Sequence, residues 1–411
     1  MTETQTSHPV TDFDHHDPAM VDRAHAVFSD LREHCPVAKT EAHGGFWVLS
    51  DYDAVQLAAR NDELFSSANN LANRRGISIP PMPARAGIIE TDAPRFTQLR
   101  KLFVPWFSPG AAEARRGQVE ALTHYCIDQV IESGACDLTK DITAPIPAML
   151  TMLFLGFPAS DSVWMGDLFH RHSYLPPESP ERAEVERDVI SLAEQMRIRA
   201  LERRANPRDD FMSFLATIEI AGELLTLDEI AEEAFLVLSG GIDTTTVLLT
   251  NTLLYLNDKP QLRAQLLADK ALMATAFEEF LRYFSPIQGL ARTVTRDCEF
   301  AGVHLKEDDR VWLSWASANL DESIFPDAGT IDLCRSPNRH MAFGVGTHRC
   351  LGANLAKVAW HSAITAILQR MSDYRIDLTA SERYHTIGIV NGWIGTPTAF
   401  TPGERIGAEL P

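Results

Sequence analysis

The chain has few cysteines, and none of them forms a Cys-x-x-Cys pair. The six are widely scattered: Cys35, Cys126, Cys136, Cys298, Cys334 and Cys350. This spacing argues against a disulfide framework and against a zinc site built from thiolate pairs. It favours a protein that works in the reducing cytoplasm.

Positive charge is also scarce. Lys and Arg number 37 against 56 Asp and Glu, which gives a formal net charge of −19 over 411 residues. Such an acidic balance argues against nucleic acid as a partner. The opening residues 1–20 are polar and acidic and carry no hydrophobic signal segment or membrane anchor. We therefore expect a cytoplasmic protein with no membrane anchor.

No Pro-, Gly- or Ser-rich linker and no repeat divides the chain, although its length would allow two or three domains. We predict one domain over residues 1–411, with a helix-rich core at about 92–285 and 351–371. Alternating apolar patterns place the β-containing segments at about 36–50, 298–317 and 372–400. The predicted fold class is mainly α with small β-sheets.

One cysteine has an unusual setting, the stretch Phe343-Gly344-Val345-Gly346-Thr347-His348-Arg349-Cys350-Leu351-Gly352. Gly344 and Gly346 can take positive φ and let the backbone fold close beneath a flat ligand. Apolar residues then recur at helical spacing, so Cys350 would sit at the positive end of a helix, which favours a thiolate. A dinucleotide loop is excluded because Arg349 replaces the third glycine and no βαβ pattern surrounds it. Taken alone, a single cysteine is more often a small buried apolar residue.

A long helix is predicted from Thr226, where Thr226 and Glu229 form a capping box, to about Leu256. Its middle reads Ser239-Gly240-Gly241-Ile242-Asp243-Thr244-Thr245-Thr246, and each glycine costs about 1 kcal/mol in a helix interior. Two explanations stay open. The glycines could permit a close helix crossing, or a threonine could bond a preceding carbonyl and open the helix at a functional site.

These two stretches resemble the haem-binding signature and the Gly-Gly-x-Asp-Thr oxygen-activation motif of the cytochrome P450 family. The resemblance implies the P450 fold, with haem b sandwiched between the long central helix and the helix after the cysteine loop. It makes Cys350 the axial iron ligand. It also implies that Thr244 steadies dioxygen, the co-substrate, and that Asp243 delivers protons.

The resemblance assigns further residues to the haem. Phe343, Gly344 and Gly352 would lie against the ring, and the expected partners of the propionates are His348, Arg292 and Arg100. Phe96 stands where many members have a histidine, so one propionate would have fewer donors.

Glu279 and Arg282 resemble the family's E-x-x-R pair. An acid and a guanidinium at this spacing share one helix face, and in isolation such pairs are usually solvated. Where the family often has an arginine that completes a triad, this chain has Thr330. The sequence leaves open whether the pair closes on backbone, on Asn338 or Arg339, or on water.

The implied activity is that of a haem-thiolate monooxygenase that inserts one atom of O2 into a mid-sized, largely apolar organic substrate, most simply by hydroxylation. The residues expected to line the substrate pocket are Leu236, Gly240, Ile287, Leu290 and Ile394, with Leu71, Ile77, Ile79 and Ile88 from the loop at 66–90. Arg74 and Arg75 are the nearest charges in sequence. A peroxide-driven enzyme and a non-catalytic haem sensor are the alternatives, and Asp243-Thr244 argues against both.

Electrons must come from outside, because the chain carries no flavin or nicotinamide fingerprint. The resemblance implies a ferredoxin and an NAD(P)H-dependent ferredoxin reductase, serving a monomer. A basic patch for docking could comprise Arg115, Arg116, Arg339, Arg349 and Lys357, although ordinary solvated charge explains these residues equally well. The histidines His15, His16, His170 and His172 lack a further ligand set, and we expect them to be solvated.

Overall fold

A computed structural model describes residues 9–70, 75–82 and 85–410 of the chain. Leu71 and Arg74, expected near the substrate, lie outside the described residues. The helices are α1 (Met20–His34), α2 (Tyr52–Arg60), α3 (Arg95–Phe103), α4 (Pro109–Glu113), α5 (Arg116–Val130), α6 (Pro145–Leu155), α7 (Ser162–Tyr174), α8 (Pro180–Ala205), α9 (Phe211–Thr217), α10 (Leu227–Tyr255), α11 (Pro260–Ala268), α12 (Lys270–Phe284), α13 (Trp315–Ala318) and α14 (Ala353–Arg370). The strands are β1 (Val37–Thr40), β2 (Phe46–Leu49), β3 (Phe65–Ser66), β4 (Ala135–Asp137), β5 (Glu219–Ile220), β6 (Glu223–Leu224), β7 (Leu290–Val294), β8 (Cys298–Phe300), β9 (Val303–Leu305), β10 (Arg310–Leu313), β11 (Arg375–Ile376), β12 (Glu382–Arg383), β13 (Trp393–Gly395) and β14 (Pro397–Ala399).

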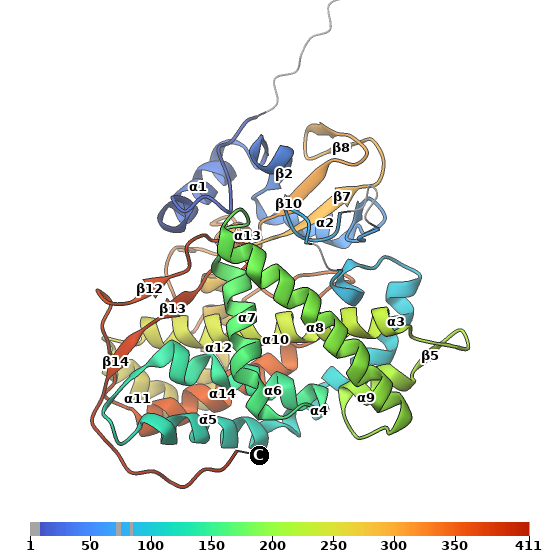
Figure 1. The fold of residues 1–411 in the computed structure, drawn as a ribbon. Coiled ribbons are helices and arrows are strands. Elements are labelled where there is room, and N and C mark those ends of the chain that lie inside the picture. Colours follow the sequence, from blue (N-terminus) through green and yellow to red (C-terminus); the bar gives the residue numbers. More distant parts are fainter. Residues whose placement is uncertain (1–8, 71–74, 83–84, 411) are drawn as a thin grey trace, which may run out of the picture.

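The fold is mainly α with small sheets, as predicted. Figure 1 shows the helices gathered in one larger body, with α1, α2 and the strands β2, β7 and β10 grouped beyond one end of it. Helix α10 runs through the helical body and packs against α6, α7, α8 and α14. Apolar residues on nearly every side of α10 are buried, as expected for a helix that crosses a core.

Helix α10 begins as its sequence predicts. The Thr226 side chain accepts from the Glu229 backbone N–H, and the Glu229 carboxylate accepts from the Thr226 N–H. This reciprocal cap satisfies two N–H groups that would otherwise lack partners. The helix then continues without interruption across Gly240 and Gly241.

The largest sheet has the strand order β1-β2-β10-β7-β3. Strand β10 pairs parallel with β2 and antiparallel with β7. Strands β3, β4, β5, β6 and β7 lie outside the segments predicted to hold β-structure. Strand β7 is a buried five-residue run without polar–apolar alternation, so periodicity alone could not distinguish it from a buried helix segment.

The N-terminal histidines contradict the prediction that they are solvated. His15 is fully buried, and its ring packs on Trp312 with a centroid separation of 4.3 Å. Burial lowers the pKa of His15 well below its ordinary value and that of His16 to about 4. A sequence offers no sign of this because the packing partners lie far along the chain.

Within the described ranges, no helix has the length and apolar character needed to cross a bilayer.

Candidate active site

A cavity of about 440 Å³ lies between the middle of α10 and the loop that precedes α14. Gly240 and Thr244 line it from α10, and Gly344 and Cys350 line it from the loop. Its volume and largely apolar lining are those of a site for a small organic ligand or cofactor.

Cys350 opens onto this cavity rather than onto bulk solvent, which is why it is both exposed in area and enclosed by protein. The enclosure raises the pKa of its thiol. Hydrogen bonds from the backbone N–H groups of Gly352 and Ala353, and the charges of Arg349 and Arg100, act in the opposite direction. Gly352 is the N-cap of α14, so the sulfur lies at the positive end of a helix as predicted.

The loop geometry also follows the sequence. Gly344 and Gly346 have φ values of 67° and 78°, a conformation that favours glycine. At Gly346 a Cβ atom would lie 2.5 Å from the backbone oxygen of Ala59, so the loop packs directly on the end of α2. Phe343 lines the cavity beside Cys350.

The two helix-interior glycines of α10 have different roles. The structure shows both the close helix crossing and the threonine–carbonyl bond, but the helix is not opened there. A Cβ at Gly241 would lie 2.6 Å from Thr151 Oγ1, so this glycine permits the close crossing of α10 with α6. A Cβ at Gly240 would meet nothing within 4 Å, because Gly240 faces the cavity. Thr244 Oγ1 donates to the Gly240 carbonyl at 2.9 Å, the predicted side-chain bond to a preceding carbonyl.

Asp243 points away from the cavity into a buried polar cluster. Tyr384 Oη donates to Asp243 Oδ1 at 2.7 Å, and His170 Nδ1 bonds the same oxygen. The second carboxylate oxygen and His170 Nε2 are buried without a hydrogen-bond partner among the described residues. Burial and Asp243 raise the pKa of Tyr384 well above its ordinary value, so its hydroxyl stays a donor. The prediction that His170 is solvated is therefore wrong.

His172 was also expected to be solvated, and it is not. It lines the cavity and lies 2.8 Å from Arg182 through its Nε2 atom. Burial, with the nearby Arg182 charge, lowers the pKa of His172 to about 3.

Three basic side chains meet at one side of the cavity: Arg292 on β7, Arg100 on α3 and His348 in the cysteine loop. Arg292 is 4% exposed, donates to the Ala291 carbonyl at 2.7 Å and makes no ion pair with any residue that the structure describes. Burial lowers its pKa to about 10. An isolated buried guanidinium is costly unless an anion joins it.

His348 has the same incomplete environment. Its Nε2 lies 3.1 Å from Ser67 Oγ, while its Nδ1 is buried and unpartnered within the described part of the chain. Phe96 packs on the ring at a centroid separation of 4.1 Å, so the residue that replaces the expected histidine orients His348. An anionic group between Arg292, Arg100 and His348 would satisfy all three. The residues therefore fit a cofactor with acidic side chains and a thiolate ligand.

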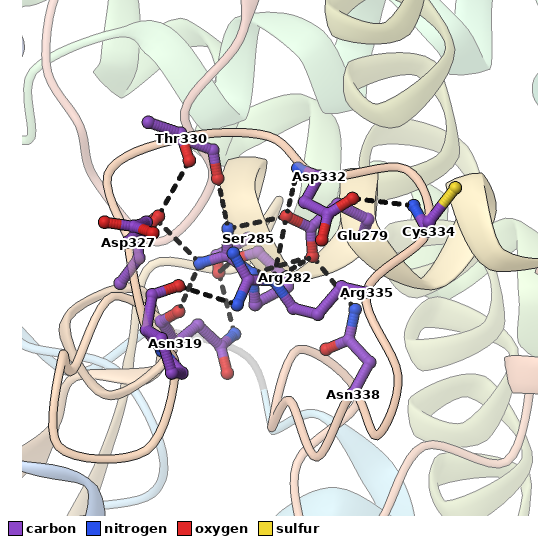
Figure 2. A network of polar contacts seen from close by, with 12 residues as sticks. Glu279, Arg282, Ser285, Asn319, Asp327, Thr330, Asp332, Cys334, Arg335 and Asn338 are labelled. Carbon is purple, nitrogen blue, oxygen red and sulfur yellow. Dashed lines mark hydrogen bonds and ion pairs between the residues drawn. The ribbon is translucent and has the colours of Figure 1, made fainter.

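Glu279 and Arg282 form a fully buried ion pair with contacts of 2.8 Å (Figure 2). Arg282 also donates to three backbone carbonyls, those of Asn319, Ala328 and Thr330. Backbone carbonyls are therefore among the partners of the Glu279–Arg282 pair, as one of the open alternatives proposed.

The remaining partners of Glu279 correct the prediction. Arg335 Nε lies 3.1 Å from Glu279 Oε2, so an arginine does complete the triad, five residues beyond Thr330 (Figure 2). Asn338 Nδ2 and the backbone N–H of Asp332 also donate to this carboxylate. Together these donors outweigh the effect of burial and lower the pKa of Glu279. Arg339 makes no side-chain bond to the pair among the described contacts.

Most expected pocket residues line the cavity: Leu236, Gly240, Ile287, Leu290, Ile77, Ile79 and Ile88. Ile394 does not; it lies on β13 against a small apolar cluster with Val247, Tyr384 and Val390. Sequence reasoning missed Glu233, a buried carboxyl on α10 that lines the cavity seven residues before Gly240. Desolvation raises its pKa to about 8, against an opposing hydrogen bond from the Ile88 backbone.

Comparison with known proteins agrees with this geometry. The family pattern of cytochrome P450 matches residues 42–373. A steroid C26-monooxygenase of Mycobacterium tuberculosis is 33% identical over 394 residues, which cover 93% of this chain and 95% of the relative. A methyl-branched lipid omega-hydroxylase of the same organism is 31% identical, with 84% of each chain covered. A crystal structure of a Mycobacterium marinum cytochrome P450 in complex with pseudoionone superposes with a TM-score of 0.86 at 26% identity, over 96% of this chain and 100% of that one.

The chain belongs to the cytochrome P450 family. It is a cytochrome P450 monooxygenase, an oxidoreductase of the class that binds haem through a cysteine thiolate and uses O2.

Proposed function

We propose that Cys350 is the axial ligand of haem b and that the enzyme hydroxylates a mid-sized, largely apolar substrate. The observation that carries this proposal is the pairing of Cys350 on one wall of the cavity with Gly240 and Thr244 on the other. Arg292, Arg100 and His348 would hold the propionates, and Phe343, Gly344 and Gly352 would pack at the ring. Bound haem supplies the redox chemistry that activates dioxygen.

Thr244 and Asp243 would position and deliver the protons that the reaction consumes at this site. The Thr244 hydroxyl lines the cavity while its hydrogen goes to the Gly240 carbonyl, so its oxygen can accept a hydrogen bond there. Asp243 is the adjacent residue, and its Oδ1 atom bonds His170 Nδ1 and Tyr384 Oη in the buried cluster behind the cavity wall. We propose that protons reach the cavity through His170 and Asp243.

Thr244→Ala should uncouple the reaction. Product formed per NAD(P)H consumed should fall about a hundredfold, the low end of what a positioned proton-transfer group contributes, while hydrogen peroxide accumulates. The matched control is Thr246→Ala, because Thr246 makes the same bond to the Ile242 carbonyl but does not line the cavity. Product and peroxide are measured together by chromatography and a peroxidase assay. Full coupling in Thr244→Ala would remove this residue from the mechanism.

The substrate should combine an apolar body with one polar group. Two relatives are a steroid monooxygenase and a branched-lipid hydroxylase. Two carboxyls line the cavity here: Glu186 pairs with Arg182, whereas Glu233 is buried and makes no ion pair among the described residues. With a pKa of about 8, the Glu233 carboxyl is protonated at neutral pH and can donate a hydrogen bond to a substrate carbonyl.

This assignment predicts a pH dependence. Because Glu233 carries its proton below about pH 8, a ketone should bind well at neutral pH and lose affinity as the pH rises through about 8. Glu233→Leu should weaken ketone binding about tenfold at pH 7, and Glu233→Gln, which keeps a donor, should not. Affinities are read from the spin-state change of the haem on titration with a steroid ketone and with its deoxo analogue. Equal affinity of the two ligands at all pH values would exclude Glu233 as the polar contact.

We propose a ferredoxin and an NAD(P)H-dependent ferredoxin reductase as electron donors. Of the basic residues suggested for docking, Arg116 pairs with Glu113 and Lys357 with Glu278. Arg115, Arg339 and Arg349 make no ion pair within the described residues, and Arg349 lies next to Cys350, so we place the centre of the docking surface at Arg349. Cavity-lining residues extend from His16 to Val390, which supports one domain over the whole chain. A monomeric state stays a prediction.

A further inference from the structure

A carboxylate and imidazoles meet between the N-terminal segment and the turn that joins β1 to β2. Asp14, His15 and His43 each offer one donor atom, and these three atoms lie within 4.8 Å of one another. His43 Nε2 already lies 2.8 Å from Asp14 Oδ1. No role in the monooxygenase reaction accounts for this cluster.

The tautomer of His15 leaves a lone pair without a partner. Its Nε2 atom lies 2.7 Å from the Ile79 carbonyl oxygen, and a carbonyl only accepts, so Nε2 carries the hydrogen. Nδ1 therefore presents a lone pair, and this atom is buried with no hydrogen-bond partner among the described residues. Buried polar atoms are normally satisfied. Histidines that bind metals typically donate their other ring N–H to a carbonyl or carboxylate in this way.

The surroundings hold the His15 ring in place. It packs on Trp312 and meets the edge of Phe46, and its backbone oxygen accepts from the Gly388 N–H at 2.8 Å. His43 can adjust more freely, because its side chain is 18% exposed in the turn between the strands. One rigid donor and one adjustable donor allow the three atoms to close around an ion.

We propose that Asp14, His15 Nδ1 and His43 bind one Zn²⁺ ion, with water as the fourth ligand. Two imidazoles and a carboxylate are a common zinc ligand set, with metal–ligand distances of about 2.0–2.2 Å. The carboxylate offsets part of the ionic charge at a partly enclosed site.

The ion would tie the N-terminal segment to the substrate cavity. His15 and His16 both bond the Ile79 carbonyl, at 2.7 Å and 3.1 Å, and His16 and Ile79 line the cavity. Bound zinc would thus fix this part of the cavity wall. The inference does not depend on the assignment of the haem ligand.

The test is a zinc titration of the full-length haem protein after removal of adventitious metal with a chelator. Calorimetry should show one Zn²⁺ per chain with a dissociation constant of about 1 μM or lower. His43→Asn, which suits the positive φ of 53° at this position, should weaken binding about tenfold or more. The control is His34→Asn, since His34 pairs with Asp30 on the exposed face of α1, and its affinity should equal that of the parent.

A second measurement guards against a general effect of the substitution. Hydrogen exchange should slow at the amides of residues 10–17 and 42–45 when Zn²⁺ is added, and Asp14→Asn should abolish the change. Absence of stoichiometric zinc binding would overturn the proposal. So would equal zinc affinity in His43→Asn and His34→Asn, or exchange that zinc does not alter.

Discussion

Cys350→Ala is expected to lower substrate oxidation by about a thousandfold or more, to background. The alanine cannot donate an anionic sulfur to iron, and that donation is what favours cleavage of the O–O bond in this class of enzyme. A thousandfold loss corresponds to about 4 kcal/mol of barrier. The fold should be retained, because the Cys350 side chain faces the cavity and its replacement by alanine removes no atom packed in the core.

Product formation with surrogate ferredoxin and reductase measures this effect. Cys334→Ala is the matched control, since Cys334 is also exposed but does not line the cavity. Circular dichroism of both variants should equal that of the parent. Sustained turnover in Cys350→Ala would show that another group holds the cofactor.

Glu279→Ala should destabilise the protein by about 3–5 kcal/mol, because it leaves the buried guanidinium of Arg282 without its anion. Arg335 loses the same partner. The matched control is Glu194→Ala. Glu194 pairs with Arg197 at the same i,i+3 spacing, but its side chain is 64% exposed, so its loss should cost less than about 1 kcal/mol.

Urea unfolding followed by circular dichroism compares the two variants. The pKa of Glu279 is lowered in the folded protein, so its contribution is present above the ordinary glutamate range and is lost as the pH falls through the folded value. The parent should therefore lose more stability than Glu279→Ala on acidification. Equal unfolding midpoints for Glu279→Ala and Glu194→Ala would show that the buried network does not support the fold.

The features that the sequence predicted are those with local causes. The capping box links Thr226 to Glu229, and Thr244 bonds the Gly240 carbonyl, so each contact joins residues at most four positions apart. The positive φ values belong to single residues, Gly344 and Gly346. Backbone geometry fixes such contacts, so residue types at fixed spacing suffice to predict them.

The features that the sequence did not reveal join distant segments. Arg335 reaches Glu279 across 56 positions through irregular chain, and no spacing rule links them. His170 and Tyr384 lie 73 and 141 positions from Asp243. The packing of α7 against α10 brings His170 to Asp243. The sequence does not show this packing, so it could not predict that His170 is enclosed.

The central claim is that the Cys350 sulfur binds haem iron as a thiolate, and one spectrum tests it most directly. The purified protein is reduced, exposed to carbon monoxide and compared with its reduced form without the gas. We expect the strongly red-shifted Soret band that a thiolate-ligated haem gives with this ligand, and its loss in Cys350→Ala. A band at the position typical of histidine-ligated haem, or an unchanged spectrum in the variant, would contradict the account.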